Sequence, residues 1–139
     1  MKIFVHFESR QMRWNITTPN PKNYPYAEEL IKLLWTKHEV IGVPILPIKE
    51  LVKRVKEDMD TFVTIDSFLP HMAHYYGKFG FVIFGQSDPN IFGYPDNINI
   101  LKDRKNLRER QFWNWEQTPY KPEVFPTAQE VFNIINQYI

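Results

Sequence analysis

The sequence predicts an α/β domain in which a mainly parallel β-sheet lies between two layers of helices, a Rossmann-like three-layer arrangement. Short, continuously apolar segments alternate along the chain with segments whose apolar residues recur at helical spacing. Continuously apolar strands are typical of a parallel sheet that is covered on both faces. The 139 residues have the length of one domain, and 43% of them are hydrophobic, which is enough to build a core.

The apolar segments that are rich in β-forming residues are the predicted strands. They cover residues 3–7, 38–43, 61–65, 81–84 and 98–101. Between the first strand and the first helix, residues 8–25 are polar and contain three prolines, which indicates a long loop. A loop of this length in a compact domain often carries function.

The segments with helical spacing are the predicted helices. They cover residues 26–35, 48–58, 67–76 and 127–138. Ser67 is the predicted cap of the third helix, and Thr127 and Glu130 have the spacing of a capping box at the last one. Residues 102–126 show no clear periodicity, so we expect them to wrap the surface of a single domain that spans residues 1–139.

The balance of charged residues argues against two classes of partner, nucleic acids and anionic membranes. The 17 basic and 16 acidic residues leave a formal net charge of +1, which argues against an extended surface for nucleic acid or an anionic membrane. The absence of cysteine excludes disulfides and thiolate metal sites. The sequence shows neither a signal peptide nor an apolar run of about 20 residues, so we expect a cytoplasmic protein without a membrane span.

The most informative polar residues lie between positions 66 and 71. Asp66 and Ser67 follow a predicted strand and begin a predicted helix, and His71 lies about one turn further along. A helix start presents free backbone N–H groups and a positive partial charge, which suit a phosphate. Each residue also has a structural interpretation: Ser67 as a helix cap, Asp66 as an acceptor for loop N–H groups, and His71 as a surface residue.

These residues belong to a longer pattern. Residues 66–73 read Asp-Ser-Phe-Leu-Pro-His-Met-Ala, and after the strand at 81–84 residues 85–89 read Gly-Gln-Ser-Asp-Pro. This resembles the C-terminal, nucleotide-sugar-binding half of heptosyltransferase-like glycosyltransferases, glycosyltransferase family nine, which have two Rossmann domains in the GT-B arrangement. The family pattern is Asp-Ser/Thr-Gly-x-x-His-x-Ala, then a strand and a Gly-x-x-Asp-Pro turn. The resemblance extends more weakly over residues 1–100.

The resemblance implies that residues from two segments face the diphosphate of a nucleotide-sugar donor. They are Ser9, Arg10 or Arg13, Asp66, Ser67 and His71. Without the resemblance, either arginine is a solvated loop residue. The donor is a substrate, and the family requires neither a cofactor nor a metal. No residue pattern in the sequence indicates a metal site.

The chain departs from the family pattern in ways that bear on activity. Phe68 replaces a glycine that lets the backbone approach phosphate closely, so the pocket must be reshaped or the ligand shifted. Met12 stands where the family has a basic residue. The family's N-terminal acceptor half, with its acidic catalytic base, has no counterpart in 139 residues. A βα unit before Gly42 is also shortened, and with it the acidic residue that binds the nucleotide ribose.

Several functions remain open at this point. The first is a glycosyltransferase-like domain that binds a nucleotide-sugar donor and transfers the sugar to a hydroxyl, with a partner chain or a second copy supplying the acceptor side. Its catalytic base is unknown, with His6 and Glu8 as internal candidates. The alternatives are a non-catalytic nucleotide or nucleotide-sugar binder and a structural or interaction domain that has lost the site. Whether the domain is an enzyme stays open.

Overall fold

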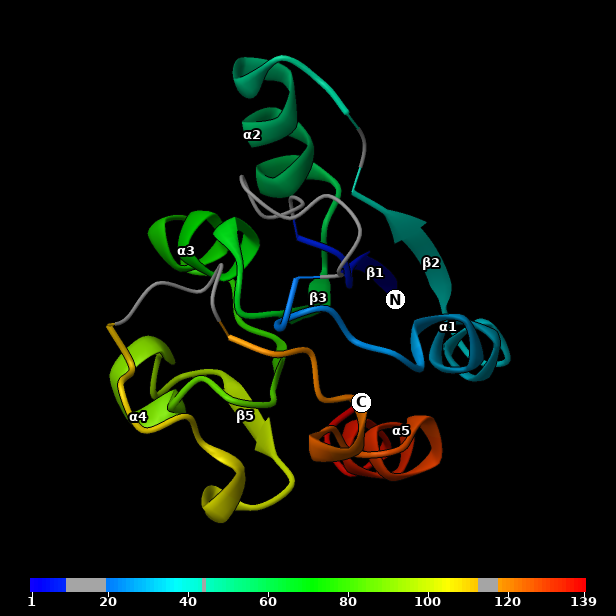
Figure 1. Ribbon diagram of the computed structural model, residues 1–139. Coiled ribbons are helices and arrows are strands. Elements are labelled where there is room, and N and C mark those ends of the chain that lie inside the picture. The colour runs from blue at the N-terminus through cyan, green and yellow to red at the C-terminus, as the bar shows by residue number, and fades with distance from the viewer. Residues whose placement is uncertain (10–19, 44, 113–117) are drawn as a thin grey trace.

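The computed structural model describes residues 1–9, 20–43, 45–112 and 118–139. Five strands form one sheet, in which every neighbouring pair is parallel (Figure 1). The strands are β1 (Lys2–His6), β2 (Glu39–Gly42), β3 (Thr61–Ile65), β4 (Phe81–Phe84) and β5 (Ile98–Leu101). Their order in the sheet is β2-β1-β3-β4-β5, so the chain changes direction across the sheet between β1 and β3.

Helices cover both faces of this sheet. They are α1 (Ala27–Trp35), α2 (Ile48–Glu57), α3 (Phe68–Tyr75), α4 (Pro89–Phe92) and α5 (Ala128–Asn136). Figure 1 shows α1 and α5 on one face and α2 and α3 on the other, with α4 beside the β5 edge. Two short 3₁₀ helices, Arg104–Asn106 and Pro122–Val124, lie between β5 and α5. The predicted three-layer α/β domain with a parallel sheet is confirmed.

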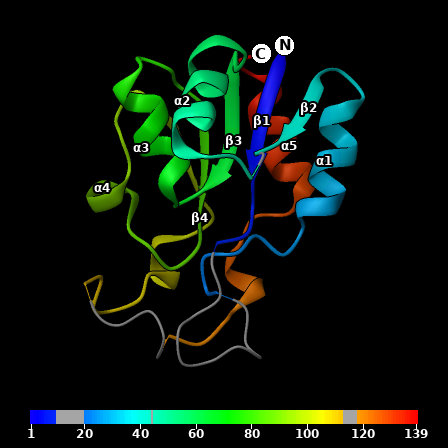
Figure 2. The ribbon, with the colours of Figure 1, turned by 90° about the horizontal axis from the view of Figure 1, so that it is seen from above.

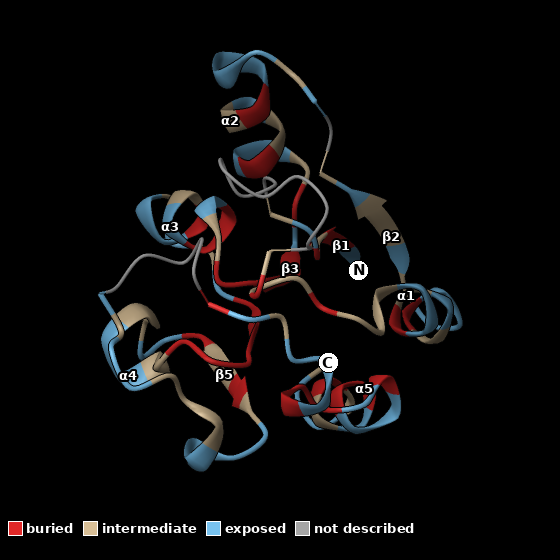
Figure 3. Ribbon diagram, viewed as in Figure 1, coloured by how far each residue is buried: buried red, intermediate tan, exposed pale blue. Residues whose placement is uncertain are grey.

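Each face of the sheet has its own hydrophobic cluster, because successive strand residues point to opposite faces. On one face, Val63 and Ile65 of β3 pack in a cluster that includes Leu30 of α1 and Val131 of α5. On the other face, Phe62 of β3 packs in a cluster with side chains of α2 and α3. Burial follows the same division: the helices are buried where they face the sheet and exposed on their outer sides (Figure 3).

The segment between β5 and α5 begins at the surface and ends in the core. Lys102 and Asp103 are exposed, whereas Val124 and Phe125 are buried. A Cβ atom at Gly85, the residue after β4, would lie 2.7 Å from the Phe125 ring. The ring therefore occupies space that only glycine leaves open. Part of the predicted surface-wrapping segment thus contributes to the core.

The two chain ends lie at the amino ends of the strands. Met1 directly precedes β1, and its carbonyl accepts a hydrogen bond from Glu39 at the start of β2. The ring of Tyr138 lies 6.0 Å from the ring of Phe81, the first residue of β4. Figure 2 shows both termini at this end of the molecule. Across the described part of the chain, no helix combines the length and apolar character needed to cross a membrane.

Candidate functional site

The candidate site lies where the carboxyl ends of β1 and β3 meet. In the sheet, β2 and β3 lie on opposite sides of β1. The loops after β1 and β3 therefore lead away in different directions at this point. In open α/β sheets with this strand order, ligands bind at such a divergence. Register pairs His6, the last residue of β1, with Thr64, the second-last residue of β3, so the ends of the two strands lie side by side. Asp66 and Ser67 follow directly.

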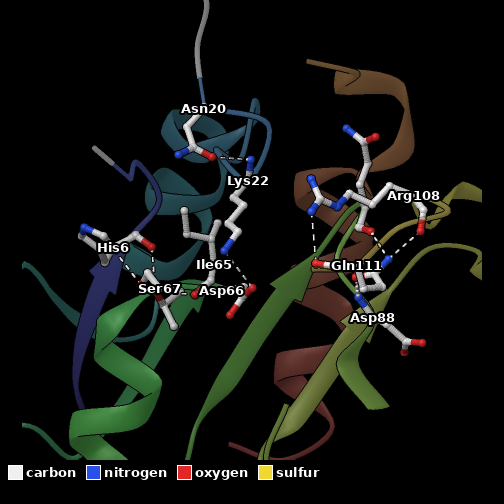
Figure 4. Close-up of polar contacts among 11 residues, drawn as sticks. His6, Asn20, Lys22, Ile65, Asp66, Ser67, Asp88, Arg108 and Gln111 are labelled. Carbon is white, nitrogen blue, oxygen red and sulfur yellow. Dashed lines mark hydrogen bonds and ion pairs between the residues drawn. The ribbon is translucent and has the colours of Figure 1, made fainter. Parts of the chain in front are cut away.

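A chain of hydrogen bonds connects the two strand ends (Figure 4). The Nδ1 atom of His6 lies 3.1 Å from the hydroxyl oxygen of Ser67. The hydroxyl of Thr64 donates to the carbonyl of His6 over 2.8 Å, and its oxygen lies 3.3 Å from that of Ser67. Ser67 is thus held by two side chains that come from the neighbouring strands.

Asp66 forms an ion pair with a residue from the loop before α1. The ammonium nitrogen of Lys22 lies 3.2 Å from a carboxylate oxygen of Asp66, and Asp66 is only 7% exposed (Figure 4). In the same loop, the Asn23 side chain accepts a hydrogen bond from the backbone of Ser9 over 2.7 Å. The described part of the long loop therefore returns to the strand ends, and its cation compensates the charge of Asp66.

Ser67 stands at the cap position of α3 without capping it. Within the described residues, its side chain makes no hydrogen bond to the first turn of α3. At two other helix starts the cap residue behaves differently: Asp88 accepts from Asn90 N–H and Thr127 accepts from Glu130 N–H. The Ser67 hydroxyl is instead directed to His6 and Thr64. Pro70, the third residue of α3, has no N–H, so the first turn presents to an anion the N–H groups of Phe68 and Leu69, which have no partner inside the helix.

His71 is placed on the other side of α3. Its Nδ1 atom lies 2.6 Å from the hydroxyl oxygen of Tyr94, and the ring of His74 stacks on the Tyr94 ring at 3.9 Å. Both histidines are exposed. The structure thus joins His71 to the loop before β5 rather than to Ser67, and a contact between His71 and a ligand stays a prediction.

Phe68 is the first residue of α3 and directly follows Ser67. Its side chain is 42% exposed, which is high for a phenylalanine that begins a helix next to a buried strand. The Phe68 ring meets the ring of His6 edge to face, with 5.1 Å between the centroids. A ligand at the start of α3 would therefore lie close to this ring.

A cavity adjoins the histidine on the side of β2. It has a volume of about 430 Å³ and is lined by residues of β1, the segment after β1, β2 and α1, among them His6, Glu8, Glu28 and Gly42. Burial lowers the pKa of His6, and the nearby carboxylate of Glu8 acts in the opposite direction. The imidazole is therefore predominantly neutral near pH 7, so its Nδ1 atom can accept or donate according to its tautomer.

A second polar cluster follows β4, at the same edge of the sheet. The side chain of Gln111 donates to the carbonyls of Gln86 and Arg108 and accepts from the backbone of Asp88 (Figure 4). The Asp88 carboxylate accepts two hydrogen bonds from Arg104, at 2.9 and 3.1 Å. These bonds, with the Asn90 N–H, lower the pKa of Asp88. This cluster closes the turn that the sequence reads as Gly-Gln-Ser-Asp-Pro.

The structure brings together part of the predicted site. Asp66, Ser67 and Ser9 lie around the β1 and β3 ends, whereas Arg10 and Arg13 fall outside the described residues. Sequence reasoning missed Lys22, Asn23 and Thr64 as members of the site. Lys22 is far from Asp66 in the sequence and lies in a proline-rich loop, so no local pattern identifies it.

Two observations on ligands and relatives complete the description. Among residues 1–9, 20–43, 45–112 and 118–139, no group of three or more histidine, aspartate or glutamate side chains is arranged to hold a metal ion. No family model, curated protein or solved structure matches the chain.

Proposed function

We propose that this domain binds a nucleotide-diphosphate sugar at the carboxyl ends of β1 and β3, as the donor-binding part of a glycosyltransferase-like protein. The observation that carries the proposal is the uncapped start of α3 beside the Ser67 hydroxyl. A hydroxyl and backbone N–H groups that converge on one point suit a diphosphate. The motif at residues 66–73 supports the sugar-nucleotide class.

The charges of the site are compatible with an anion. Asp66 alone would repel a phosphate, but Lys22 at 3.2 Å balances its charge. With the Asp66 charge balanced, the positive end of the α3 dipole makes the electrostatic potential at the first turn favourable for an anion. Arg10 and Arg13, which the resemblance assigns to the same phosphate, belong to the proposal as predicted contacts.

In the transfer reaction, the bond between the anomeric carbon of the sugar and a diphosphate oxygen breaks as a bond from an acceptor hydroxyl forms. The proton of that hydroxyl passes to a base, and negative charge grows on the departing diphosphate. Ser67 and the first N–H groups of α3 would stabilise this charge. The base and the acceptor surface would come from a partner chain or a second copy, or the base would be Glu8, two residues after β1.

A non-catalytic nucleotide-sugar binder is the second candidate. Phe68 favours it, because an exposed aromatic ring occupies the position where the resembling enzymes have a glycine. Such a ring restricts how closely the backbone and a diphosphate can approach. A binder of this kind would keep the anion site and release its ligand unchanged. Both candidates are proposed to act in the cytoplasm.

Binding is tested by thermal-shift and calorimetric measurements with UDP, GDP, ADP, CMP and their sugar conjugates. We expect Ser67→Ala to weaken the binding of the preferred ligand about 10- to 100-fold, the value of a hydrogen bond to a charged group. Thr127→Ala, which removes a hydroxyl from the start of α5, is the matched control and should leave affinity unchanged. Equal affinity of Ser67→Ala and wild type, or no shift with any nucleotide at millimolar concentration, contradicts the proposal.

Transfer is tested separately from binding. Hydrolysis or transfer of the sugar from the preferred donor, measured by release of the nucleoside diphosphate, identifies an enzyme. Binding without release, in the presence of a broad set of hydroxyl acceptors, identifies the non-catalytic binder. Phe68→Gly then shows whether the ring limits the reaction, since the variant should increase donor affinity or turnover if it does.

A further inference from the structure

The hydroxyl of Ser67 has one hydrogen and two hydrogen-bonding neighbours, His6 and Thr64. A serine hydroxyl donates one hydrogen bond and accepts others. The single hydrogen of Thr64 is directed to a carbonyl, that of His6 at 2.8 Å or its own neighbour Ile65 at 3.1 Å. Between Thr64 and Ser67, at 3.3 Å, the donor is therefore Ser67. The Ser67 hydrogen thus has two internal acceptors, the Thr64 oxygen and the unprotonated Nδ1 atom of His6.

The protonation state of His6 decides whether its Nδ1 atom accepts the Ser67 hydrogen. When Nδ1 carries no proton, it accepts the Ser67 hydrogen over 3.1 Å and draws it away from a ligand. When the imidazole is charged, both ring nitrogens carry protons, and Nδ1 donates to the Ser67 oxygen. The Ser67 hydrogen is then released from His6, and a positive charge stands one hydrogen bond away from the start of α3.

We propose that His6 is a proton-dependent positioning residue: its charged form frees the Ser67 hydroxyl hydrogen for an anion at the start of α3, and its neutral form with an unprotonated Nδ1 atom withdraws it. This inference rests on the anion site of the proposed function. It adds that binding of the diphosphate takes up a proton at His6. By linkage, the anion must raise the pKa of His6 by the same factor by which protonation raises affinity.

The charged groups around His6 are compatible with such a change. Glu8 lies two residues after His6, beyond the end of β1, and favours the charged ring, whereas burial disfavours it. Glu28 of α1 lines the same cavity as His6 and Glu8. On the side of β3, Asp66 is paired with Lys22. The edge of the Phe68 ring covers the imidazole from α3. Burial thus disfavours the charged ring without ligand, and the negative charge of an arriving anion would favour it.

The first test uses sulfate, an anion that does not titrate between pH 5 and 8. Imidazole ¹⁵N and ¹H shifts of the full chain are followed against pH in sulfate and in chloride at equal ionic strength. We expect sulfate to raise the pKa of His6 in the wild type, and this rise to disappear in Ser67→Ala. His38, which lies beyond α1 at the amino end of β2, is the control in the same spectra and should not respond. An unchanged His6 pKa, or an equal rise in Ser67→Ala, overturns the inference.

The second test measures affinity for an intact nucleotide sugar, such as UDP-glucose, GDP-mannose or ADP-glucose, whose diphosphate diester does not titrate in this range. From about pH 8 to about pH 5.5, wild-type affinity should rise, by no more than about tenfold per pH unit for one proton. His6→Asn keeps an uncharged hydrogen-bonding group near the position of Nδ1 and should make affinity vary by less than about twofold. A pH profile of His6→Asn parallel to that of the wild type overturns the inference.

Failure of the proposed function is distinguishable from failure of this inference. If no nucleotide sugar binds but sulfate raises the His6 pKa through Ser67, the anion switch stands and the ligand class is wrong. If nucleotide sugars bind with Ser67 but without proton uptake, the function stands and the switch is wrong.

Discussion

Two polar clusters lie at the carboxyl edge of the sheet, and they use their hydrogen-bonding groups differently. After β4, the side chain of Gln111 makes three hydrogen bonds to the backbone, and Asp88 both caps α4 and binds Arg104. After β3, Ser67 occupies a cap position but its hydroxyl is shared between His6 and Thr64. The first cluster holds a turn in place, whereas the second leaves a helix start open.

The comparison separates structural from functional polar residues by how they are paired. A cluster that closes its own loop gains stability when its groups are bonded internally, and a ligand would have to compete with those bonds. Pro70 in the first turn of α3 removes one of the two N–H groups that Ser67 could cap, and by turning away from the other Ser67 gives up a cap bond, typically worth about 1 kcal/mol. Such a loss at the point where the strand order diverges is the pattern expected of a ligand site. Four predictions follow the comparison from large to small effects.

The largest effect is expected where the β4 turn meets the core. Gly85→Ala would place a methyl group 2.7 Å from the Phe125 ring, so the free energy of unfolding should fall by about 2–3 kcal/mol through overpacking. Gly42→Ala is the matched control beside the candidate site, since a Cβ atom there meets nothing within 4 Å. Urea unfolding measures both. Equal losses in the two variants would show that the two regions do not differ in packing.

The next effect concerns the side chain that closes the β4 turn. Gln111→Ala leaves the carbonyl of Gln86 and the N–H of Asp88 without this partner, which should reduce the free energy of unfolding by about 1–2 kcal/mol. Gln129 lies on the exposed side of α5 and donates a hydrogen bond to the side chain of Asn133. Gln129→Ala should therefore change the free energy of unfolding by less than about 0.5 kcal/mol. Affinity for a nucleotide sugar should not change in either variant, and weaker binding by Gln111→Ala would place this cluster in the site.

A smaller effect compares two hydroxyls at helix starts. Thr127 accepts from the Glu130 N–H, so Thr127→Ala should cost about 1 kcal/mol of stability. Ser67→Ala removes no cap, so its cost should come from the lost contacts with His6 and Thr64 and stay at or below about 0.5–1 kcal/mol, while ligand binding weakens. Thermal unfolding with and without ligand tests the pair. A larger stability loss in Ser67→Ala than in Thr127→Ala would identify Ser67 as a structural residue.

The smallest effect is the dependence of stability on pH. Burial lowers the pKa of His6 and of His38 below the usual value of 6.5, and for His38 the N-terminal ammonium and Lys37 act in the same direction. Below that value the unfolded chain binds more protons than the folded protein, so the free energy of unfolding falls as the pH falls from 6.5. His38→Gln should reduce this slope. A free energy of unfolding that rises as the pH falls below 6.5 would contradict the lowered pKa values of His6 and His38. Sulfate should reduce the part of the pH dependence that comes from His6.

Local signals in the sequence predict most of the fold. The bounds of β3, β4 and β5 agree with the apolar segments at 61–65, 81–84 and 98–101, because buried parallel strands are apolar throughout. The capping-box spacing at Thr127 likewise locates the start of α5. The four-residue helix α4 was not predicted, because it is too short for a periodic pattern to appear.

The candidate site is harder to predict from local sequence signals than the fold. Asp66 and Ser67 are visible because a strand end and a helix start adjoin in the sequence. The pairing of Ser67 with His6 depends on β1 and β3 becoming neighbours in the sheet, which is a long-range property. Lys22 reaches Asp66 through the path of a loop. The direction of His71 depends on Tyr94, which lies beyond the next strand. Contacts between distant segments leave no spacing that a single sequence displays.

The position of the chain ends has a practical consequence for studying the domain. Because both termini lie at the amino ends of the strands, a tag or tether attached to either one leaves from the side opposite to the candidate site (Figure 2). A protein immobilised on a sensor surface through either terminus therefore presents the His6 and Ser67 edge to solution. The same geometry allows a fluorescent reporter to be fused at either end without obstructing the candidate site.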